Sequence, residues 1–254
     1  MVLSGGVASA PFLHELFEVA DTDTPQIVFD GSACVAQESL IKKRKSWEQV
    51  SIDFNIPEPL WVQDCVDDTL SRGKINALLD RADVLYVTGG ANRKTITQWN
   101  EAGATKDIKE RVNQGDVVAS GGSAGAMIWF NTGLSDSNFY DVKEGENWEY
   151  EAVQEAALFD SWVMAHHTDT DNLGRNKRTL FADFLRQRDG EWNYAVGIDT
   201  CAALVCIDGI AQVRDITPAS RANDGFGANI YIYFDSVREP HKLSDGDLIP
   251  LNRM

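Results

Sequence analysis

The sequence predicts one α/β domain over residues 1–254, with a mostly parallel sheet and helices on both of its faces. Two observations lead to this prediction. Short apolar, β-branched runs recur along the chain, and stretches with helical spacing of apolar residues separate them. The dipeptide Asp208-Gly209 then joins two apolar runs as a hairpin turn does, which predicts added antiparallel strands near the C-terminus. Because no repeat or low-complexity linker interrupts the pattern, no domain boundary is expected.

Most of the expected strands end in small or polar residues, which is where α/β sheets place their functional sites. Strands are expected at residues 26–29, 84–88, 117–120, 162–165, 194–198, 202–207, 210–213 and 229–234. Helices are expected at 95–102, 105–114 and 177–188. Gly103 and Gly115 close the first two helices, because left-handed helix caps favour glycine. The polar tail after residue 234 is expected at the surface or along a sheet edge.

The composition limits the classes of function. The chain has 23 Lys and Arg against 39 Asp and Glu, a formal net charge of -16, whereas phosphate-binding surfaces need excess cations. Nucleic acid and membranes are therefore not expected as partners.

No apolar run approaches the roughly 20 residues that span a bilayer, and no signal-peptide pattern follows Met1, so a cytoplasmic location is expected. The four cysteines lack CxxC spacing, which predicts neither a zinc ribbon nor a disulfide framework.

The pentapeptide at residues 121–125, GGSAG, matches the G-x-S-x-G pattern of a nucleophile elbow. It lies between the expected strand at 117–120 and the apolar stretch 126–130, where small neighbours let Ser123 sit on a strained strand-to-helix turn. The N–H groups of the following helix would then face an oxyanion. A second glycine pair, Gly89-Gly90, follows another expected strand and could supply further N–H groups. An ordinary Gly-rich turn that binds a phosphate or nothing is the alternative.

A serine nucleophile needs a base within hydrogen-bond reach and a carboxylate that orients the base. His166 and His167 directly follow the expected strand at 162–165, whose end should open onto the edge that carries Ser123. Because successive strand residues point to opposite faces, one member of the pair is expected to reach the serine. His14 is expected at the surface or in packing, and His241 in the polar tail is a less favoured base.

Carboxylates for the orienting role are more numerous. Asp136 follows the elbow helix on a polar loop, and its competitors are Asp141, Glu144 and Asp199. An α/β-hydrolase-type esterase with the order Ser123, Asp199, His241 is also open. A metal site is a further alternative, because imidazoles and carboxylates stand close together at His166, His167, Asp169 and Asp171.

Five motifs in order resemble a known family of serine peptidases, the one that includes peptidase E (aspartyl dipeptidase) and cyanophycinase. They are YVTGGAN (86–92), GGSAGAMIWF (121–130), SDS (135–137), AHHTD (165–169) and GIDTCAAL (197–204). The resemblance implies a flavodoxin-like fold related to the class I glutamine amidotransferases, a short-peptide substrate cleaved at Asp-Xaa bonds through an acyl-enzyme, and no cofactor. It makes Ser123 the nucleophile and Asp136 the third triad member, with Gly90 and Ala124 at the oxyanion hole. His167 matches the catalytic histidine, because an Asp follows it two residues later.

The sequence departs from the family at two positions. Family members usually carry an aromatic residue after the catalytic histidine, where this chain has Thr168, and cyanophycinases carry a glutamine before it, where this chain has His166. A β-Asp-Arg hydrolase is therefore the second choice. Recognition of an N-terminal Asp needs a cation, and Arg175 and Arg178 are expected to provide it, with Asn92 also at the substrate site. A homodimer through the C-terminal strands is a further possibility.

Overall fold

The computed structural model describes residues 1–254 with the exception of 7, 144–145, 222–226, 235–238 and 251–254. Its strands are β1 (Val2–Ser4), β2 (Ile27–Asp30), β3 (Leu60–Trp61), β4 (Val84–Val87), β5 (Val118–Gly122), β6 (Phe130–Ser135), β7 (Glu151–Gln154), β8 (Phe159–Ala165), β9 (Tyr194–Ile198), β10 (Ala202–Ile207), β11 (Ile210–Asp215), β12 (Ile230–Phe234), β13 (His241–Leu243) and β14 (Leu248–Pro250). Its helices are α1 (Ala10–Val19), α2 (Gln37–Phe54), α3 (Arg72–Leu79), α4 (Asn92–Glu101), α5 (Thr105–Gln114), α6 (Ala124–Met127) and α7 (Lys177–Gln187), and short 3-10 turns lie at Ser137–Tyr140 and Ala219–Arg221.

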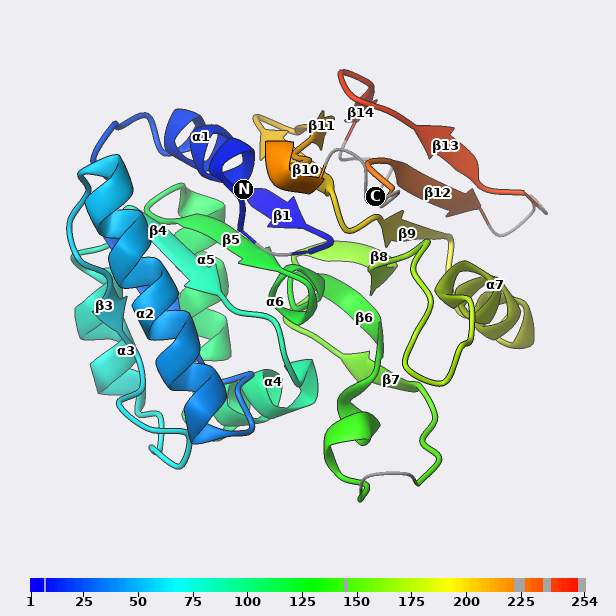
Figure 1. The fold of residues 1–254 in the computed structure, drawn as a ribbon, viewed down its shortest axis with the longest axis horizontal. Coiled ribbons are helices and arrows are strands. Elements are labelled where there is room, and N and C mark those ends of the chain that lie inside the picture. Colours follow the sequence, from blue (N-terminus) through cyan, green and yellow to red (C-terminus); the bar gives the residue numbers. More distant parts are fainter. Residues whose placement is uncertain (7, 144–145, 222–226, 235–238, 251–254) are drawn as a thin grey trace.

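The strands form two sheets, where the sequence predicted one (Figure 1). The eight-stranded sheet has the order β14-β11-β10-β1-β5-β4-β2-β3, and the six-stranded sheet has the order β13-β12-β9-β8-β6-β7. The first sheet is parallel from β1 through β5, β4 and β2 to the edge strand β3, and the second is parallel at its centre, over β6, β8 and β9. The antiparallel pairs lie toward the other edge of the first sheet, where they include the expected β10–β11 hairpin, and toward both edges of the second, so the mixed α/β class is confirmed. The polar tail lies along sheet edges as β13 and β14.

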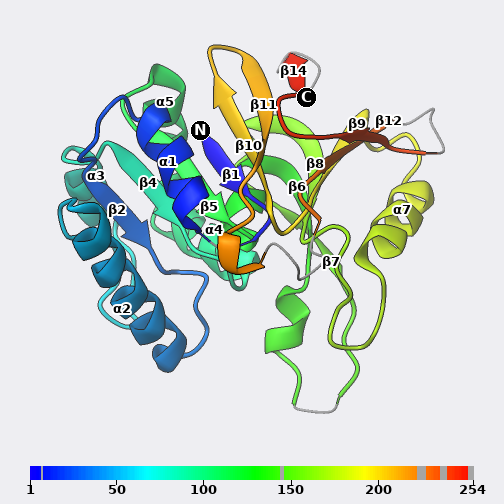
Figure 2. The same cartoon turned by 45° about the horizontal axis from the view of Figure 1, so that its top comes forward.

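Helices cover both faces of the eight-stranded sheet, because side chains alternate along its buried strands. In β4, Val84 and Tyr86 pack with α1 and α2, whereas Leu85 and Val87 pack with α3, α4 and α5. Figure 2 shows these two helix layers on either side of the sheet. On the six-stranded sheet, α7 packs its Phe181 against the face that β8, β9 and β12 present. None of the helices among the described residues is long and apolar enough to cross a membrane.

The helix after the elbow is shorter than expected. It begins at Ala124, lasts a single turn to Met127, and gives way to β6 at Phe130. Both Trp129 and Phe130 are fully buried, and Phe130 pairs with Phe159 of β8, so the chain enters the second sheet instead of continuing as a helix. The elbow therefore joins the two sheets.

The neighbouring strands β4 and β5 bring the two glycine turns together. They are parallel, and Val87 lies opposite Gly121, so the turn after β4 and the turn after β5 leave the same edge of the sheet. Gly89-Gly90 and Ser123 therefore lie at one edge of the sheet, where both turns can contribute backbone N–H groups.

Candidate active site

Ser123 has the strained backbone of a nucleophile elbow. Its φ is 57° and its ψ is -125°, a region that a residue with a Cβ rarely adopts, and its N–H donates to the Ser4 carbonyl at 2.9 Å. The turn is also too tight for larger neighbours, because a Cβ at Gly121 would collide with the Gly125 carbonyl and a Cβ at Gly125 with the Val87 carbonyl. Glycine is therefore needed on both sides of this serine.

Backbone donors stand beside the serine. A Cβ built at Gly89 would lie 3.0 Å from the Ser123 Cβ and 3.4 Å from its Oγ, so the Gly89-Gly90 turn touches the serine side chain. Gly90 has a φ of 142° and packs against the Ala33 carbonyl, where a Cβ would collide. Within the described part of the chain, no backbone acceptor takes up the N–H groups of Gly90 and Ala124. Because α6 is a single turn, these N–H groups, and not a helix dipole, are the available oxyanion donors.

Two hollows meet at Ser123. A cavity of about 330 Å³ is lined by Ser123, His166, Gly90, Lys43, Trp47 and Tyr140 among others. A narrow space of about 10 Å³ is lined by residues that include Ser123, His166, Asn92, Asp136 and Lys177. Ser123 and His166 line both, whereas His167 lines neither. The larger cavity has the volume of a small-ligand site.

The imidazole of His166 is held from one side. Its Nδ1 lies 2.7 Å from the Thr200 Oγ1 and 3.5 Å from the Asp169 Oδ2, and the Thr200 hydroxyl donates to that carboxylate at 2.7 Å. Because Thr200 gives its proton to Asp169, its oxygen is left to accept one from Nδ1, so this network places a proton on Nδ1, and among the described residues Nε2 has no hydrogen-bond partner. Burial acts to raise the pKa of Asp169, but the hydrogen bonds from His166 and Thr200 outweigh it and lower that pKa. A free Nε2 is what a general base needs.

The side chain of His167 points away from the hollows at Ser123 and packs among aromatic rings. Its side chain is fully buried, its Nε2 lies 2.6 Å from the Tyr233 hydroxyl, and its ring centroid lies 4.7 Å from that of Tyr231. Burial lowers the pKa of His167 to about 3, so the ring is neutral. The cause of this placement is the backbone of His166, whose φ of 54° turns the chain just after β8. The expected role of His167 as the base is not supported by this arrangement.

The carboxylates that could orient the histidine have different partners in the structure. Asp136 lines the narrow space with Ser123 and His166, but among the described residues its carboxylate has no hydrogen bond to His166. Asp141 pairs with Arg93, and Asp199 is buried and accepts from Thr168 and Asn229. Glu144 lies outside the described residues. Asp169 is the carboxylate linked to His166; the sequence analysis considered it as a metal ligand and as the Asp that follows the matched histidine, but not as the orienting acid.

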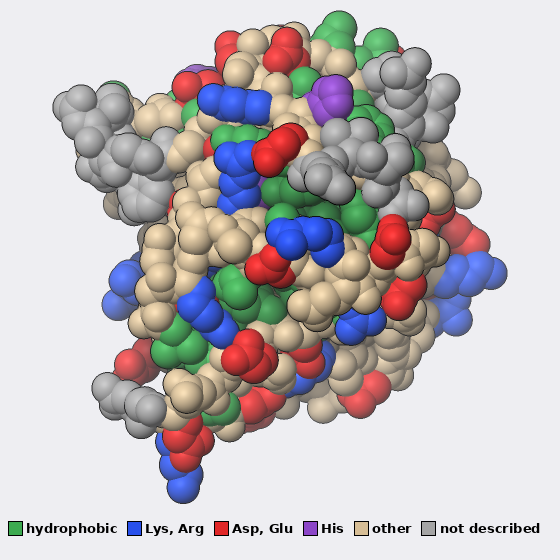
Figure 3. Space-filling view, turned by 90° about the vertical axis from the view of Figure 1, so that its right-hand side faces the viewer, with side chains coloured by type: hydrophobic (Ala, Val, Ile, Leu, Met, Phe, Trp, Pro, Cys, Tyr) green, Lys and Arg blue, Asp and Glu red, His purple; other side chains and the backbone are tan. Residues whose placement is uncertain are grey.

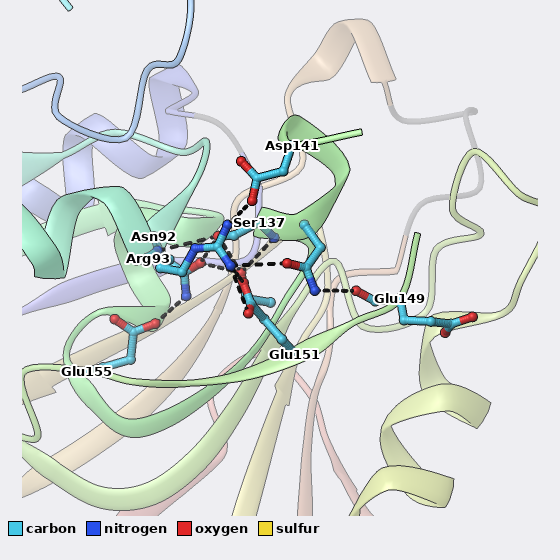
Figure 4. Close-up of polar contacts among 9 residues, drawn as sticks. Asn92, Arg93, Ser137, Asp141, Glu149, Glu151 and Glu155 are labelled. Atoms are coloured by element: carbon cyan, nitrogen blue, oxygen red, sulfur yellow. Dashed lines mark hydrogen bonds and ion pairs between the residues drawn. The ribbon is translucent and has the colours of Figure 1, made fainter. Parts of the chain in front are cut away.

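Asn92 is fixed in orientation by a buried network (Figure 4). Its Nδ2 donates to Glu155, and its Oδ1 accepts from the hydroxyls of Ser135 and Ser137, the latter at 2.9 Å. Burial raises the pKa of Glu155 to about 8, despite the hydrogen bond from Asn92. The neighbouring Arg93 is turned toward acids of its own, Asp141 and Glu151. Among the described residues, Glu155 is the one partner to which this amide donates, and Asn92 also lines the narrow space beside Ser123.

The two arginines expected at the substrate site are engaged elsewhere. Arg175 donates from Nε to Asp171 at 2.8 Å and stacks over Trp148 at 4.7 Å. Arg178 stacks over the Tyr231 ring at 5.0 Å, on the α7 side of the molecule, where acidic and basic side chains are interspersed (Figure 3). Neither lines the hollows at Ser123. The cations that do are Lys43 and Lys177, which the sequence reasoning missed although Lys177 adjoins Arg178.

The remaining alternatives are not brought together at the serine. His241 is exposed on the edge strand β13 and packs on Phe234, away from the hollows that Ser123 lines, and His14 is exposed on α1. Among the residues that the structure describes, no three His, Cys, Asp or Glu side chains are grouped to hold a metal ion. The arrangement beside Ser123 is that of a serine, an oriented imidazole and backbone donors.

This fold and this constellation define an α/β protein with a serine nucleophile elbow at the junction of two sheets. The sequence profile of peptidase family S51 matches residues 62–214, and the chain belongs to that family. The resemblance described from the motifs is thereby confirmed.

Known proteins with similar sequences or structures are also described as peptidases. An uncharacterized peptidase, YgaJ, of Bacillus subtilis (strain 168) is 39% identical over 79 residues, which are 29% of this chain and 34% of that protein, so the match spans about a third of its length. A peptidase from an acI-B1 Actinobacterium has a crystal structure with a TM-score of 0.64 at 14% identity, over 98% of this chain and 95% of that one. A putative peptidase E protein from Listeria monocytogenes EGD-e gives 0.56 at 16% identity, over 85% and 98%. These structures show that the fold is shared.

Proposed function

We propose that the protein is a serine peptidase that hydrolyses short peptides through an acyl-enzyme. The observation that carries the proposal is the meeting of Ser123 and His166 on the walls of the same two hollows, with the His166 Nδ1 engaged by Thr200. Family membership supports the reaction class. The cavity of about 330 Å³ favours a small substrate over a folded protein.

In the proposed reaction, the Ser123 Oγ attacks the scissile carbonyl while the His166 Nε2 takes the hydroxyl proton. The Gly90 and Ala124 N–H groups bind the oxygen that becomes negative. His166 then returns the proton to the leaving amine, and an acyl-serine remains. Water attacks the ester with His166 again as the base, which releases the acid and restores the serine.

We propose Asp169 as the carboxylate that orients His166, acting through the Thr200 hydroxyl. The distances of 2.7 Å from Nδ1 to Thr200 and of 2.7 Å from Thr200 to Asp169 support this role. Asp136, which the resemblance favours, stays the alternative because it lines the same narrow space. Asp169→Asn and Asp136→Asn separate the two, since the orienting acid is the one whose loss reduces kcat by about a thousandfold or more.

A preference for Asp-Xaa bonds belongs to the same proposal, with different binding residues from those expected. Lys177 and Asn92 line the narrow space beside Ser123, and this space of about 10 Å³ would have to widen for a substrate carboxylate to reach the Lys177 ammonium and the Asn92 amide. Arg175 and Arg178 are no longer proposed for this role, because other partners hold them.

A peptide panel read by mass spectrometry tests substrate and mechanism together. It contains Asp-Xaa, Glu-Xaa, Asn-Xaa and β-linked Asp-Arg peptides, and compares the wild type with Ser123→Ala and Lys177→Met. We expect cleavage of Asp-Xaa by the wild type, none by Ser123→Ala, and a higher KM for Asp-Xaa with Lys177→Met. Cleavage confined to β-linked Asp-Arg would instead identify a cyanophycinase-like hydrolase.

A further inference from the structure

Helix α2 carries a run of four basic residues, Lys42 to Lys45, and not all of them face solvent. Lys42 and Lys45 are exposed, whereas Lys43 is partly buried and its side chain enters the wall of the 330 Å³ cavity that contains Ser123. The Lys43 Nζ donates a hydrogen bond to the carbonyl oxygen of Gly89. Burial lowers the pKa of Lys43, although the neighbouring Cys34 acts to raise it. A cation in this position contacts the backbone of the catalytic turn itself.

The contacted carbonyl belongs to the peptide group whose other end is the Gly90 N–H. This peptide is planar and trans, so its C=O and N–H point in opposite directions. A hydrogen bond that holds the Gly89 oxygen on the Lys43 side therefore directs the Gly90 N–H to the other side. Gly89 itself packs on Ser123, since a Cβ there would lie 3.0 Å from the serine Cβ.

The turn needs such a restraint because it is built from two adjacent glycines, which have the widest backbone freedom. On its far side the chain is held by the Ala91 N–H, which donates to the Ala33 carbonyl at 2.9 Å. That bond fixes the end of the turn but does not involve the Gly89–Gly90 peptide. Among the described residues, the bond from Lys43 is the hydrogen bond that holds this peptide plane.

We propose that Lys43 is a positioning residue that orients the Gly89–Gly90 peptide so that the Gly90 N–H faces the oxyanion. The inference rests on the proposed serine peptidase function. A charged donor binds a carbonyl more strongly than a neutral one and also polarises the peptide, which makes the Gly90 N–H a better donor. Because the oxyanion exists only after attack by Ser123, Lys43 acts on the transition state more than on substrate binding.

Steady-state kinetics of three variants test the role of Lys43. Lys43→Met keeps the length of the side chain and removes the donor, Lys43→Arg keeps a charged donor, and Lys42→Met removes an exposed charge one residue away as the matched control. For Lys43→Met we expect kcat to fall by about 10- to 100-fold, less than the loss of an oxyanion donor itself, with KM within about threefold of the wild type. Lys43→Arg should recover part of the loss, and Lys42→Met should behave as the wild type.

Inhibition by a peptide aldehyde distinguishes the proposed role of Lys43 from a purely structural one. The aldehyde forms a tetrahedral adduct with the serine, so its affinity should fall with Lys43→Met by the same factor as kcat, whereas the affinity for the uncleaved peptide acid should not change. If Lys43→Met does not fold, Lys43→Gln carries the test, because its shorter, neutral amide replaces the charged donor and kcat should still fall. Unchanged kcat, or a rise in KM alone, would overturn the proposal, and the second result would make Lys43 a substrate-binding residue.

Failure of the proposed function is a separate result, in which Ser123→Ala cleaves like the wild type.

Discussion

Two adjacent histidines have different surroundings because of one backbone torsion. The sequence predicts that one of the pair reaches Ser123, and the geometry agrees, but the resemblance matched His167 by its spacing to Asp169. With φ at 54°, His166 takes the position beside the serine and His167 enters an aromatic cluster. If His166 is the base, as we propose, the His167 ring stands where family members usually carry an aromatic residue after the catalytic histidine, and this departure in the sequence disappears. A positive φ at a non-glycine residue is not readable from the sequence.

Substitution of each histidine separates their roles. We expect His166→Ala to lower kcat by about a thousandfold or more, because it removes the base, while Thr200 and Asp169 remain in place. His167→Phe keeps an aromatic ring among Phe181, Tyr231 and Tyr233 and should retain kcat within about tenfold. Steady-state kinetics with the cleaved peptide measure both. A large loss with His167→Phe and a small one with His166→Ala would return the base to His167.

At the scale of helices and strands, the sequence predicted the elements that are marked by nearby residues, such as a glycine at a helix end. α5 has the predicted bounds and ends at Gly115 with φ at 80°, because a glycine cap is visible in the sequence. By contrast, α2 was not predicted, since only Leu40, Trp47 and Ser51 of its 18 residues are buried and the apolar spacing is weak. β1 has three residues, too few for an alternation to show. The division into two sheets also escaped prediction, because strand patterns do not say which strands pair.

The elbow depends on a glycine that no larger residue replaces. Gly125→Ala should destabilise the protein by about 3 kcal/mol, because its Cβ would collide with the Val87 carbonyl. Gly73→Ala on α3 is the control: no atom lies within 4 Å of its Cβ, and alanine at a helical position should stabilise by roughly 0.5–1 kcal/mol. Urea unfolding followed by circular dichroism measures both. Equal stability of the two variants would show that the tight contact at the elbow is not present.

At the scale of the whole molecule, a shared apolar core and polar contacts around Asn92 connect the two sheets. The largest apolar cluster contains Leu85 of β4 as well as Val163 of β8, so the sheets share a core. The Asn92–Glu155 hydrogen bond also joins them, because Asn92 begins α4 beside the first sheet and Glu155 follows β7 of the second. A buried acid at the junction has no sequence signature, since most Glu residues are exposed.

This buried acid should make stability depend on pH. Its folded pKa is raised from 4.5 to about 8, so the unfolded chain ionises first; the favourable contribution is complete below pH 4.5 and is lost as pH rises through about 8. We expect Glu155→Gln to remove this decline and to be more stable than the wild type at pH 8, by on the order of 2 kcal/mol. Unfolding free energies at pH 5 and pH 8 measure it, with the exposed Glu58→Gln as the control. An unchanged pH dependence in Glu155→Gln would contradict the raised pKa.

Ser123 is the residue on which the proposed chemistry most directly depends. The decisive measurement is kcat/KM of purified, folded Ser123→Ala against the wild type on the peptide that the panel identifies. We predict a loss of at least about a thousandfold, leaving only the contribution of substrate binding and the backbone donors. Hydrolysis by Ser123→Ala at the wild-type rate would contradict a nucleophilic serine at this elbow.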